Sequence, residues 1–313
     1  MSVKPLLGCG MPMLDREAEN GGGSRADKSL GRRAIIVSGD DFGISREVNA
    51  GVLRAYRDGI LRGTSLMVAG AARDEAVALA REAAGLDVGL HMVVCRGSSA
   101  LAPARLAGVV DLTGRFVENP VAGGLGYFFR RSVRSPLRDE IRAQIELHLG
   151  LIGYLNHIDG HLNFHVHPVL AAILVELAAE YRVPYVRLPA EPVFTTLRLA
   201  RDHALRKLLE AMIFRVLSRR ARRMLADRGI KSNDHLFGLH QSGNLTEDYV
   251  DGLLRRLKPG VTELYFHPAA DIGGTPPDMR AQREVAILTS ARIRETLTRE
   301  GIELTNFAQL ACQ

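Results

Sequence analysis

The stretch that indicates the fold is AIIVSGDD, residues 34–41. It opens with four apolar residues and closes with Gly39 and two aspartates. A continuous apolar run of this length is typical of a strand buried on both faces of a parallel sheet. Further strands are predicted at 64–68, 87–92, near Asn156, 185–188 and 263–266.

Helical patterns alternate with these strands. Ser45 is placed to cap the first helix, which is predicted to end near Gly59. Later helices are predicted at 73–84, 136–151, 168–181, 246–257 and 281–299. This alternation predicts an α/β fold with parallel strands, most simply a TIM-barrel-like (β/α) barrel, with a doubly wound open sheet as the alternative. No G-x-G-x-x-G or Walker sequence opens a helix, so nucleotide binding has no support.

The composition is that of a globular protein: 313 residues, 46% hydrophobic, 24% charged and a mean hydropathy of 0.00. We expect a flexible tail over 1–33 and a single domain over 34–313. The longest apolar run, near 169–179, is too short to span a bilayer. The N-terminus has no continuous apolar signal region, so a cytoplasmic location is expected. The cysteines form no C-x-x-C pair, which argues against a cysteine metal site: Cys9, Cys95, Cys312.

The positive charge is concentrated in one segment. Residues 198–231 contain 11 Lys and Arg against 3 Asp and Glu, a net +8, which leaves −2 for the rest of a chain of net charge +6. Apolar side chains recur there at helical spacing: Leu205, Leu209, Met212, Val216. Arginines occupy another side: Arg215, Arg219, Arg222, Arg223.

This segment predicts a basic amphipathic helical insertion at about 196–231. Two interpretations stay open. The helix either packs on the domain with a solvated outer face, or it contacts anionic lipid headgroups as a peripheral membrane element. Nucleic acid is not an expected partner, because aromatic content is 5% and no base-reading motif is present.

Polar residues follow several of the predicted strands. Asp40 and Asp41 close the first strand, His91 closes the third, 157–161 surrounds the fourth, and His267 follows a late one. Any one of these residues alone is commonly a helix cap or a buried core residue. Because the carboxyl ends of parallel strands meet at one end of a barrel, their joint occurrence predicts a shared metal centre.

The fourth of these places shows a polar residue at every second position: His157, Asp159, His161, Asn163, His165, His167. As a single strand the stretch would extend over about 33 Å, longer than strands usually are. Only one or two of these neighbours can bind one ion, so the others must orient ligands, bind substrate or pack. A polar sheet face beside solvent is the alternative. Pro168 then begins the next helix.

Several motifs together resemble the YdjC-like carbohydrate deacetylases, in order and spacing from about residue 34 to 269. They are Ser38–Gly43, Val48–Asn49 with Gly51, Gly63–Val68, Val88–His91, His157–His161 and Glu263–Pro268. Three stretches look most like the branch associated with hopanoid biosynthesis: Asp159–Pro168, Val186–Pro192 and Phe237–Gly243. One departure is Asn163, where many members of the family have His.

The resemblance implies a distorted β/α barrel and one divalent metal ion held by Asp41, His91 and His161. It also implies hydrolysis of the N-acetyl amide of an N-acetylglucosaminyl substrate, a glycosylated hopanoid lipid in that branch. Zn and Mg are the first candidates for the metal and Mn and Ni are open, because His and Asp sites accept all four to differing degrees. The oligomeric state is left open, a homodimer included.

Amide hydrolysis needs an activated water, a stabilised oxyanion and a proton for the departing amine. A ligating Asp41 cannot also act as the base, so Asp40 is the candidate base. His267 is the candidate acid, because a histidine is readily protonated close to neutral pH. Residues predicted to surround the ligands or contact substrate are His157, Asp159, Asn163, His165, Arg187 and Glu191. For Arg187 and Glu191, a salt bridge or a capping role is the alternative.

Three other functions remain open. The first is deacetylation of soluble chitooligosaccharides. The second is a metal-dependent hydrolase or isomerase of sugar phosphates, against which the scarcity of Gly and Lys at the strand ends counts. The third is a membrane-surface binding protein whose metal site is structural and has four protein ligands.

Overall fold

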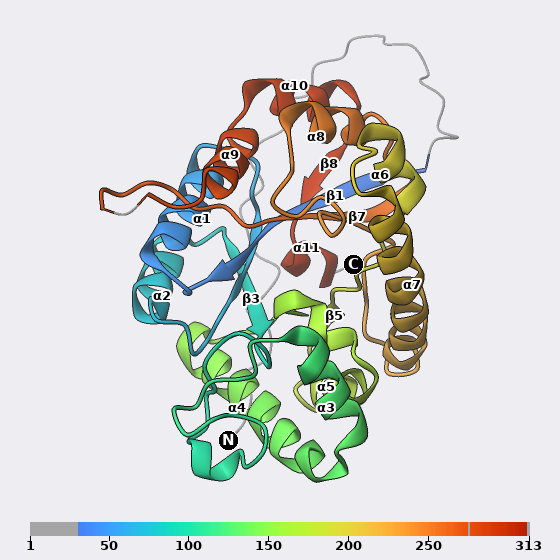
Figure 1. The fold of residues 1–313 in the computed structure, drawn as a ribbon. Helices are drawn as coiled ribbons and strands as arrows, with labels where there is room; N and C mark the ends of the chain where they lie inside the picture. The colour runs from blue at the N-terminus through green and yellow to red at the C-terminus, as the bar shows by residue number, and fades with distance from the viewer. Residues whose placement is uncertain (1–30, 275, 312–313) are drawn as a thin grey trace.

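The computed structural model describes residues 31–274 and 276–311, and within them eight strands form one sheet in which every pairing between strands is parallel (Figure 1). The strands are β1 (Arg33–Phe42), β2 (Gly63–Leu66), β3 (Asp87–Met92), β4 (His157–Gly160), β5 (Tyr185–Val186), β6 (His235–Phe237), β7 (Gly260–Phe266) and β8 (Glu303–Thr305). Most of the predicted tail, together with Cys9 and Cys312, lies outside the described residues.

The sheet follows the order β5-β4-β3-β2-β1-β7-β6, and β8 pairs with the start of β1. Its two outer edges come together: the Val186 amide donates to the Lys231 carbonyl at 3.0 Å, and the Asn233 side chain bonds both backbone groups of Leu188 at 2.7 and 2.8 Å. The sheet is thus curled into a half-barrel, which confirms the predicted α/β barrel over the open sheet.

Helices surround this half-barrel, with α1, α2 and α9 on the left of Figure 1 and α6 and α7 on the right. The α-helices are α1 (Arg46–Arg57), α2 (Arg73–Glu82), α3 (Pro120–Phe129), α4 (Arg134–Ile152), α5 (Pro168–Glu180), α6 (Val193–Leu199), α7 (Ala204–Ala226), α8 (Glu247–Leu254), α9 (Met279–Leu288), α10 (Ala291–Arg299) and α11 (Phe307–Ala311). The short 3₁₀ segments are η1 (Pro103–Arg105), η2 (Arg131–Val133) and η3 (His161–Val166).

Local signals set several helix boundaries. The Ser45 hydroxyl accepts from the Val48 amide and Pro168 begins α5, both as predicted. The prediction of a single helix over 281–299 is wrong. It is two helices, because Ser290 caps the second by accepting from the Ile293 amide.

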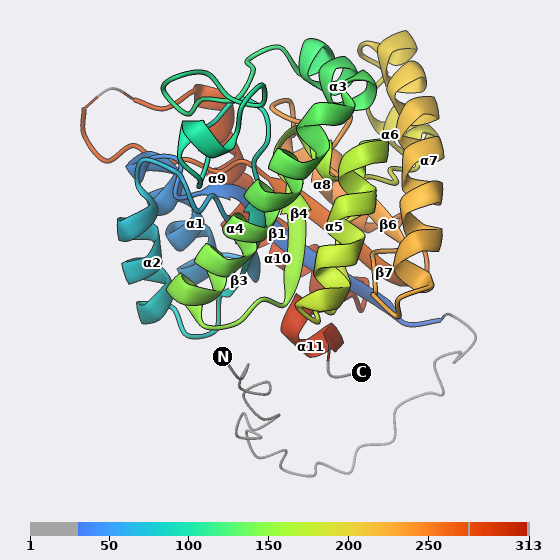
Figure 2. The ribbon, with the colours of Figure 1, turned by 90° about the horizontal axis from the view of Figure 1, so that it is seen from below.

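Helix α11 lies at the amino ends of the strands. The Phe307 ring stacks on the His157 ring at 3.5 Å between centroids, and the Ala308 amide donates to Asp87, the first residue of β3. In Figure 2 this helix is at the lower edge of the molecule, while α3, α6 and the start of α7 are at the upper edge. The upper edge is therefore the side of the carboxyl ends, where chemistry is expected in such folds.

The predicted basic insertion forms α6 and α7. Its predicted apolar face is exposed, at 72% for Leu205 and 61% for Met212, whereas α7 buries other residues against the protein, among them Ala221 and Leu225. Helix α7 thus packs on the domain, as one of the two interpretations has it, but its predicted apolar face lies on the exposed side; contact with lipid headgroups stays a prediction. Among the helices of the described residues, none combines the length and the apolar character that a membrane crossing needs.

Candidate metal centre

The site begins with an irregularity at the end of β1. The register with β2 shifts between Gly39 and Phe42, and Asp41 adopts a left-handed backbone conformation with a φ of 65°. Neighbouring side chains of a regular strand point to opposite faces, but a bulge re-aims them. Here it lets Asp40 and Asp41 both contact groups of one site. The strand also runs to Phe42, so the aspartates lie within it and not after it.

Three predicted ligands converge. The Asp41 Oδ1 atom lies 3.1 Å from His91 Nε2 and 2.8 Å from His161 Nδ1. Two ligand atoms on a tetrahedral ion with bonds of about 2.1 Å would be about 3.4 Å apart, so little adjustment is required. One carboxylate and two imidazoles are a donor set that divalent metals accept. The residues therefore fit one divalent ion.

The electrostatics around Asp41 favour its charged form. Burial alone would raise the pKa of the Asp41 carboxyl, but hydrogen bonds from His161 and His91 hold it well below its usual value. A deprotonated carboxylate is the form that binds a metal ion.

A second contact fixes the orientation of His91. Its Nδ1 atom lies 2.7 Å from Asp159 Oδ1 and 3.0 Å from Ser65 Oγ. Without a metal, Nδ1 donates to Asp159 and Nε2 donates to Asp41. A bound ion would replace the Nε2 proton, while the Asp159 contact keeps the proton on Nδ1, which is the tautomer a ligand needs. Burial disfavours the charged ring, yet Asp159 and Asp41 raise the pKa of His91 to about 10.

Arg187 lies at the centre of a carboxylate cluster and is 1% exposed. Its guanidinium donates to both oxygens of Asp40 at 2.6 and 2.8 Å and to Glu263 at 2.7 Å, and it lies 2.9 Å from Asp159. Of the two roles foreseen for Arg187, the structure therefore gives it the salt bridge and not an exposed contact to sugar hydroxyls. The paired bonds hold Asp40 in one orientation.

A second group of possible ligands comprises Asp40, His91 and Asp159. Its two carboxylates are already paired with the Arg187 guanidinium. The Arg187 cation thus already offsets part of the charge of this group, so Asp41, His91 and His161 are the better candidate ligand set.

Two other predicted histidines lie beneath the centre. His165 Nε2 is 2.9 Å from the Arg187 carbonyl, which helps to hold that arginine's backbone. His157 packs on Phe307 at the barrel floor. Burial lowers the pKa of His165 to about 4 and that of His157 to about 3, so both rings are neutral near pH 7. Because both are buried, the alternative of a polar sheet face beside solvent is wrong for them.

The remaining residues that were predicted to belong to the site lie around it. Asn163 lies against the Tyr265 side chain in a left-handed conformation. His267 is edge-on to Tyr265 at 5.6 Å, and the pairing of Gly39 with Phe266 brings it level with Asp40 on the neighbouring strand. Glu191 is set apart, because its carboxylate accepts from two backbone amides of the 239–240 segment and from a threonine hydroxyl.

Sequence reasoning missed Glu263 and Ser65 as parts of the site. Glu263 is fully buried, and burial raises its pKa to about 7 despite the Arg187 contact. The alternation of Glu263 and Tyr265 in β7 with His267 directly after it was an available signal, since alternate residues of a strand share one face. Ser65 gave no such signal, because small polar residues are common in strands.

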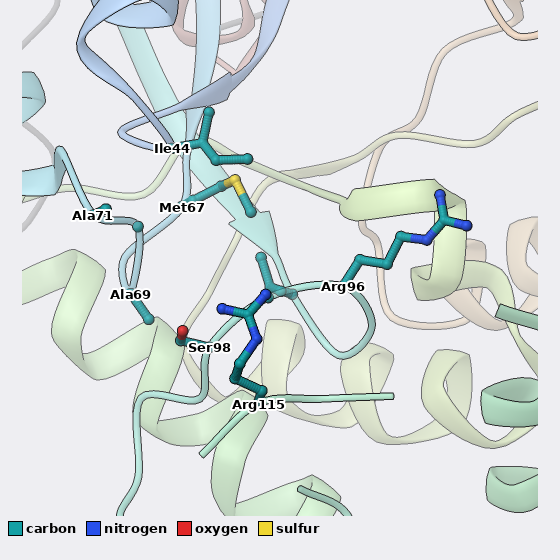
Figure 3. Close-up of a pocket in the computed structure, with 10 residues that line it drawn as sticks. Ile44, Met67, Ala69, Ala71, Arg96, Ser98 and Arg115 are labelled. Carbon is teal, nitrogen blue, oxygen red and sulfur yellow. The ribbon is translucent and has the colours of Figure 1, made fainter. Parts of the chain in front are cut away.

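A pocket of about 230 Å³ opens at the carboxyl ends of β1, β2 and β3 (Figure 3). Ile44, Met67 and Val93 form its apolar wall, each within a few residues of these strand ends. In Figure 3 the Arg115 guanidinium points into the pocket, whereas Arg96 extends away from it. The pocket thus lies at the same end of the barrel as the ligands, and no sequence motif predicted it.

Known proteins resemble this chain in sequence and in fold. The family described as YdjC-like protein matches residues 34–299. A protein of Brevibacillus brevis named carbohydrate deacetylase is 30% identical over 284 residues, which cover 88% of this chain and 99% of the relative. One of the same name from Geobacillus stearothermophilus is 28% identical, covering 88% and 98%.

Among solved structures, a candidate cellobiose-phosphate cleavage protein of Enterococcus faecalis superposes with a TM-score of 0.69. It is 22% identical, and the match covers 89% of this chain and 99% of that one. This likeness concerns the fold alone. The match of the family over most of the chain, together with the Brevibacillus relative, shows that this chain belongs to the YdjC-like family.

Proposed function

We propose that the protein is a metal-dependent deacetylase that hydrolyses the N-acetyl amide of an N-acetylglucosaminyl substrate. The observation that carries the proposal is the convergence of Asp41, His91 and His161 beside the Asp40–Arg187 pair. The names of the relatives support it, since those proteins are called carbohydrate deacetylases.

The proposed chemistry divides the work among separate groups. A divalent metal bound at Asp41, His91 and His161 would lower the pKa of a bound water towards about 7 and polarise the acetyl carbonyl. Asp40 accepts the proton of the attacking water. Arg187 occupies one lone pair on each Asp40 oxygen, and each oxygen keeps a second lone pair for this proton. His267 supplies a proton to the departing sugar nitrogen.

Other residues keep these groups in place. Asp159 holds the His91 ring, and His165 holds the backbone of Arg187. Asn163 and Tyr265, at the carboxyl ends of β4 and β7, are proposed to contact the sugar. The pocket in Figure 3 is proposed to take the part of the substrate next to the acetyl group.

We further propose a lipid-linked substrate, a glycosylated hopanoid, met at the cytoplasmic side of the inner membrane. Two of the stretches that resemble the hopanoid-associated branch lie side by side, because Glu191 accepts from the amides of Leu239 and His240. They border a groove of about 710 Å³ with apolar walls from Phe194, Leu208 and Met212. A groove of this size suits a hydrocarbon group.

The test is incubation of the purified protein, loaded in turn with Zn, Mg, Mn or Ni, with an N-acetylglucosaminyl lipid and with short chitooligosaccharides. Release of acetate and free amine is the expected result, with the lipid as the better substrate. Acetate from neither substrate under any metal would refute deacetylation, and preference for the soluble sugar would refute the lipid-linked substrate.

Asp40→Asn tests the base separately from the metal. This variant should retain bound metal and lose turnover, while Asp227→Asn, an exposed aspartate at the end of α7, should retain both. Normal turnover by Asp40→Asn would remove Asp40 as the base.

A further inference from the structure

Large apolar side chains are exposed mainly on three helices. Of the sixteen that are exposed among the described residues, eleven lie on α3, α6 and α7. We call them the apolar rim: Val121, Leu125, Phe128, Phe129, Phe194, Leu205, Leu208, Leu209, Met212, Ile213, Val216. Scattered apolar residues need no explanation, but a concentration of this kind marks an interaction surface.

The rim members of α7 form one continuous stripe. They recur three or four residues apart from Leu205 to Val216, as the apolar face of an amphipathic helix does. This face is turned away from the core, because the residues that α7 buries are others, such as Ser218 and Ala221. Within the part of the chain that the structure describes, this face of α7 is therefore an apolar surface left uncovered.

The rim adjoins the metal centre. Segment η3, which begins with the ligand His161, packs against α7 and touches α3, where the Phe164 and Tyr127 rings are 6.3 Å apart. Leu162, the residue after that ligand, is itself 39% exposed. In Figure 2 the α3 helix, α6 and the start of α7 stand along the upper edge, the side of the strands' carboxyl ends.

A groove of about 600 Å³ adjoins the rim. Its lining includes Phe128 of α3, Val169 and Ile173 of α5 and Arg220 of α7. Helices α3 and α7 therefore contribute both exposed apolar side chains and nearby basic side chains to this side of the protein.

The charge around the rim distinguishes between candidate partners. Helix α7 has seven Lys and Arg residues and a single acidic residue, Glu210, and three arginines follow α3 at 130, 131 and 134. In a symmetric dimer through this face, the same cations would meet across the interface and repel. A bilayer with anionic headgroups offers both an apolar interior and opposite charge.

We propose that the apolar rim binds the surface of an anionic bilayer, with the α3 and α7 side chains inserted among the lipids and the metal centre facing the headgroups. This inference deepens the proposed function, since it names the surface through which a lipid-linked substrate would be reached. It adds α3 and a definite orientation to the basic helix foreseen from the sequence.

Vesicle flotation tests it without any turnover, so that it can fail or succeed independently of deacetylation. The wild-type protein is mixed with vesicles of equal parts phosphatidylglycerol and phosphatidylcholine, or of phosphatidylcholine alone. Leu209→Glu with Met212→Glu places two charges on the rim. The matched control, Ala78→Glu with Thr298→Glu, adds the same charges at exposed positions of α2 and α10.

We expect the wild type and the control to float with the anionic vesicles and the rim variant to lose about tenfold or more in partitioning. Circular dichroism and metal content report whether each variant is folded. Phe129→Glu, on α3, should give a smaller loss in the same direction.

Three outcomes would overturn the proposal: wild type that stays unbound with both vesicles, a rim variant that floats as well as the control, or a dimer in sedimentation that the rim variant dissociates without any vesicle binding. Equal binding to phosphatidylcholine alone would overturn the role of the anionic headgroups.

Discussion

The metal centre and the apolar rim depart from the usual distribution of side chains in opposite directions. At the centre, charged residues are buried: Arg187, Asp159 and Glu263 are each at most 1% exposed. On the rim, apolar residues are exposed, up to 72% for Phe129 and Leu205. Buried charges require partners within the protein, so the metal centre is cross-linked by ion pairs, whereas the rim side chains are exposed and make few such contacts.

The two regions therefore suit different functions, the metal centre for chemistry and the rim for binding. The buried charges are tolerated because each one is paired, as the three carboxylates around Arg187 illustrate. The exposed apolar groups are largely uncovered by the described residues, and they form the surface that we propose to bind the bilayer. The predictions below test the two regions against each other.

The largest effect is expected at the ligands. His161→Ala should lower metal affinity by at least about 100-fold, since loss of an outer partner alone costs about 10–100-fold. Elemental analysis after dialysis measures it. His203→Asn, which removes an exposed imidazole outside the centre, should leave the metal content unchanged. Full occupancy in His161→Ala would show that His161 is not a ligand.

The next effect concerns the buried arginine. Arg187→Met leaves Asp40, Asp159 and Glu263 buried without their cation, which should cost about 3–5 kcal/mol of unfolding free energy. Arg138→Met breaks a partly exposed pair with Glu176 and should cost about 1 kcal/mol or less. Urea unfolding compares them, and similar losses would contradict the distinction between buried and exposed pairs.

Acid should destabilise the protein through its buried histidines. Burial lowers the pKa of His148 to about 4, below the value of about 6.5 in an unfolded chain. Between these values the unfolded state binds more protons, so this contribution is complete above pH 6.5 and is lost as the pH falls towards 4. Urea unfolding of the metal-free protein at several pH values measures the slope.

His148→Leu removes one titrating group from the core. Its stability should therefore fall less steeply over this window, by about 1.4 kcal/mol per pH unit. The same slope in variant and wild type would mean that His148 is not buried in its neutral form.

The smallest effect is expected on the rim. Met212→Ser replaces a side chain that is 61% exposed and should change the unfolding free energy by less than about 0.5 kcal/mol. Met92→Ser, at a position with no exposure, should cost about 2–5 kcal/mol. A large loss of unfolding free energy in Met212→Ser would show that the rim contributes to folding. The two regions would then not differ in the way described.

Much of the architecture was readable from local pattern. Apolar runs such as 34–37 predict buried parallel strands, and polar residues after them mark the end where ligands gather. The sequence pattern was less reliable for the local backbone conformation. The alternation from His157 to His167 does not continue a strand, because Leu162 and Asn163 turn into left-handed conformations.

The sequence by itself indicated the parallel α/β barrel, because hydrophobic periodicity is a local property, and its resemblance to the YdjC-like family implied the candidate ligands Asp41, His91 and His161. Only the tertiary structure decided that Arg187 pairs with three carboxylates and that the apolar face of α7 meets solvent. Both depend on which distant segments come together, and no pattern within a single segment contains that information.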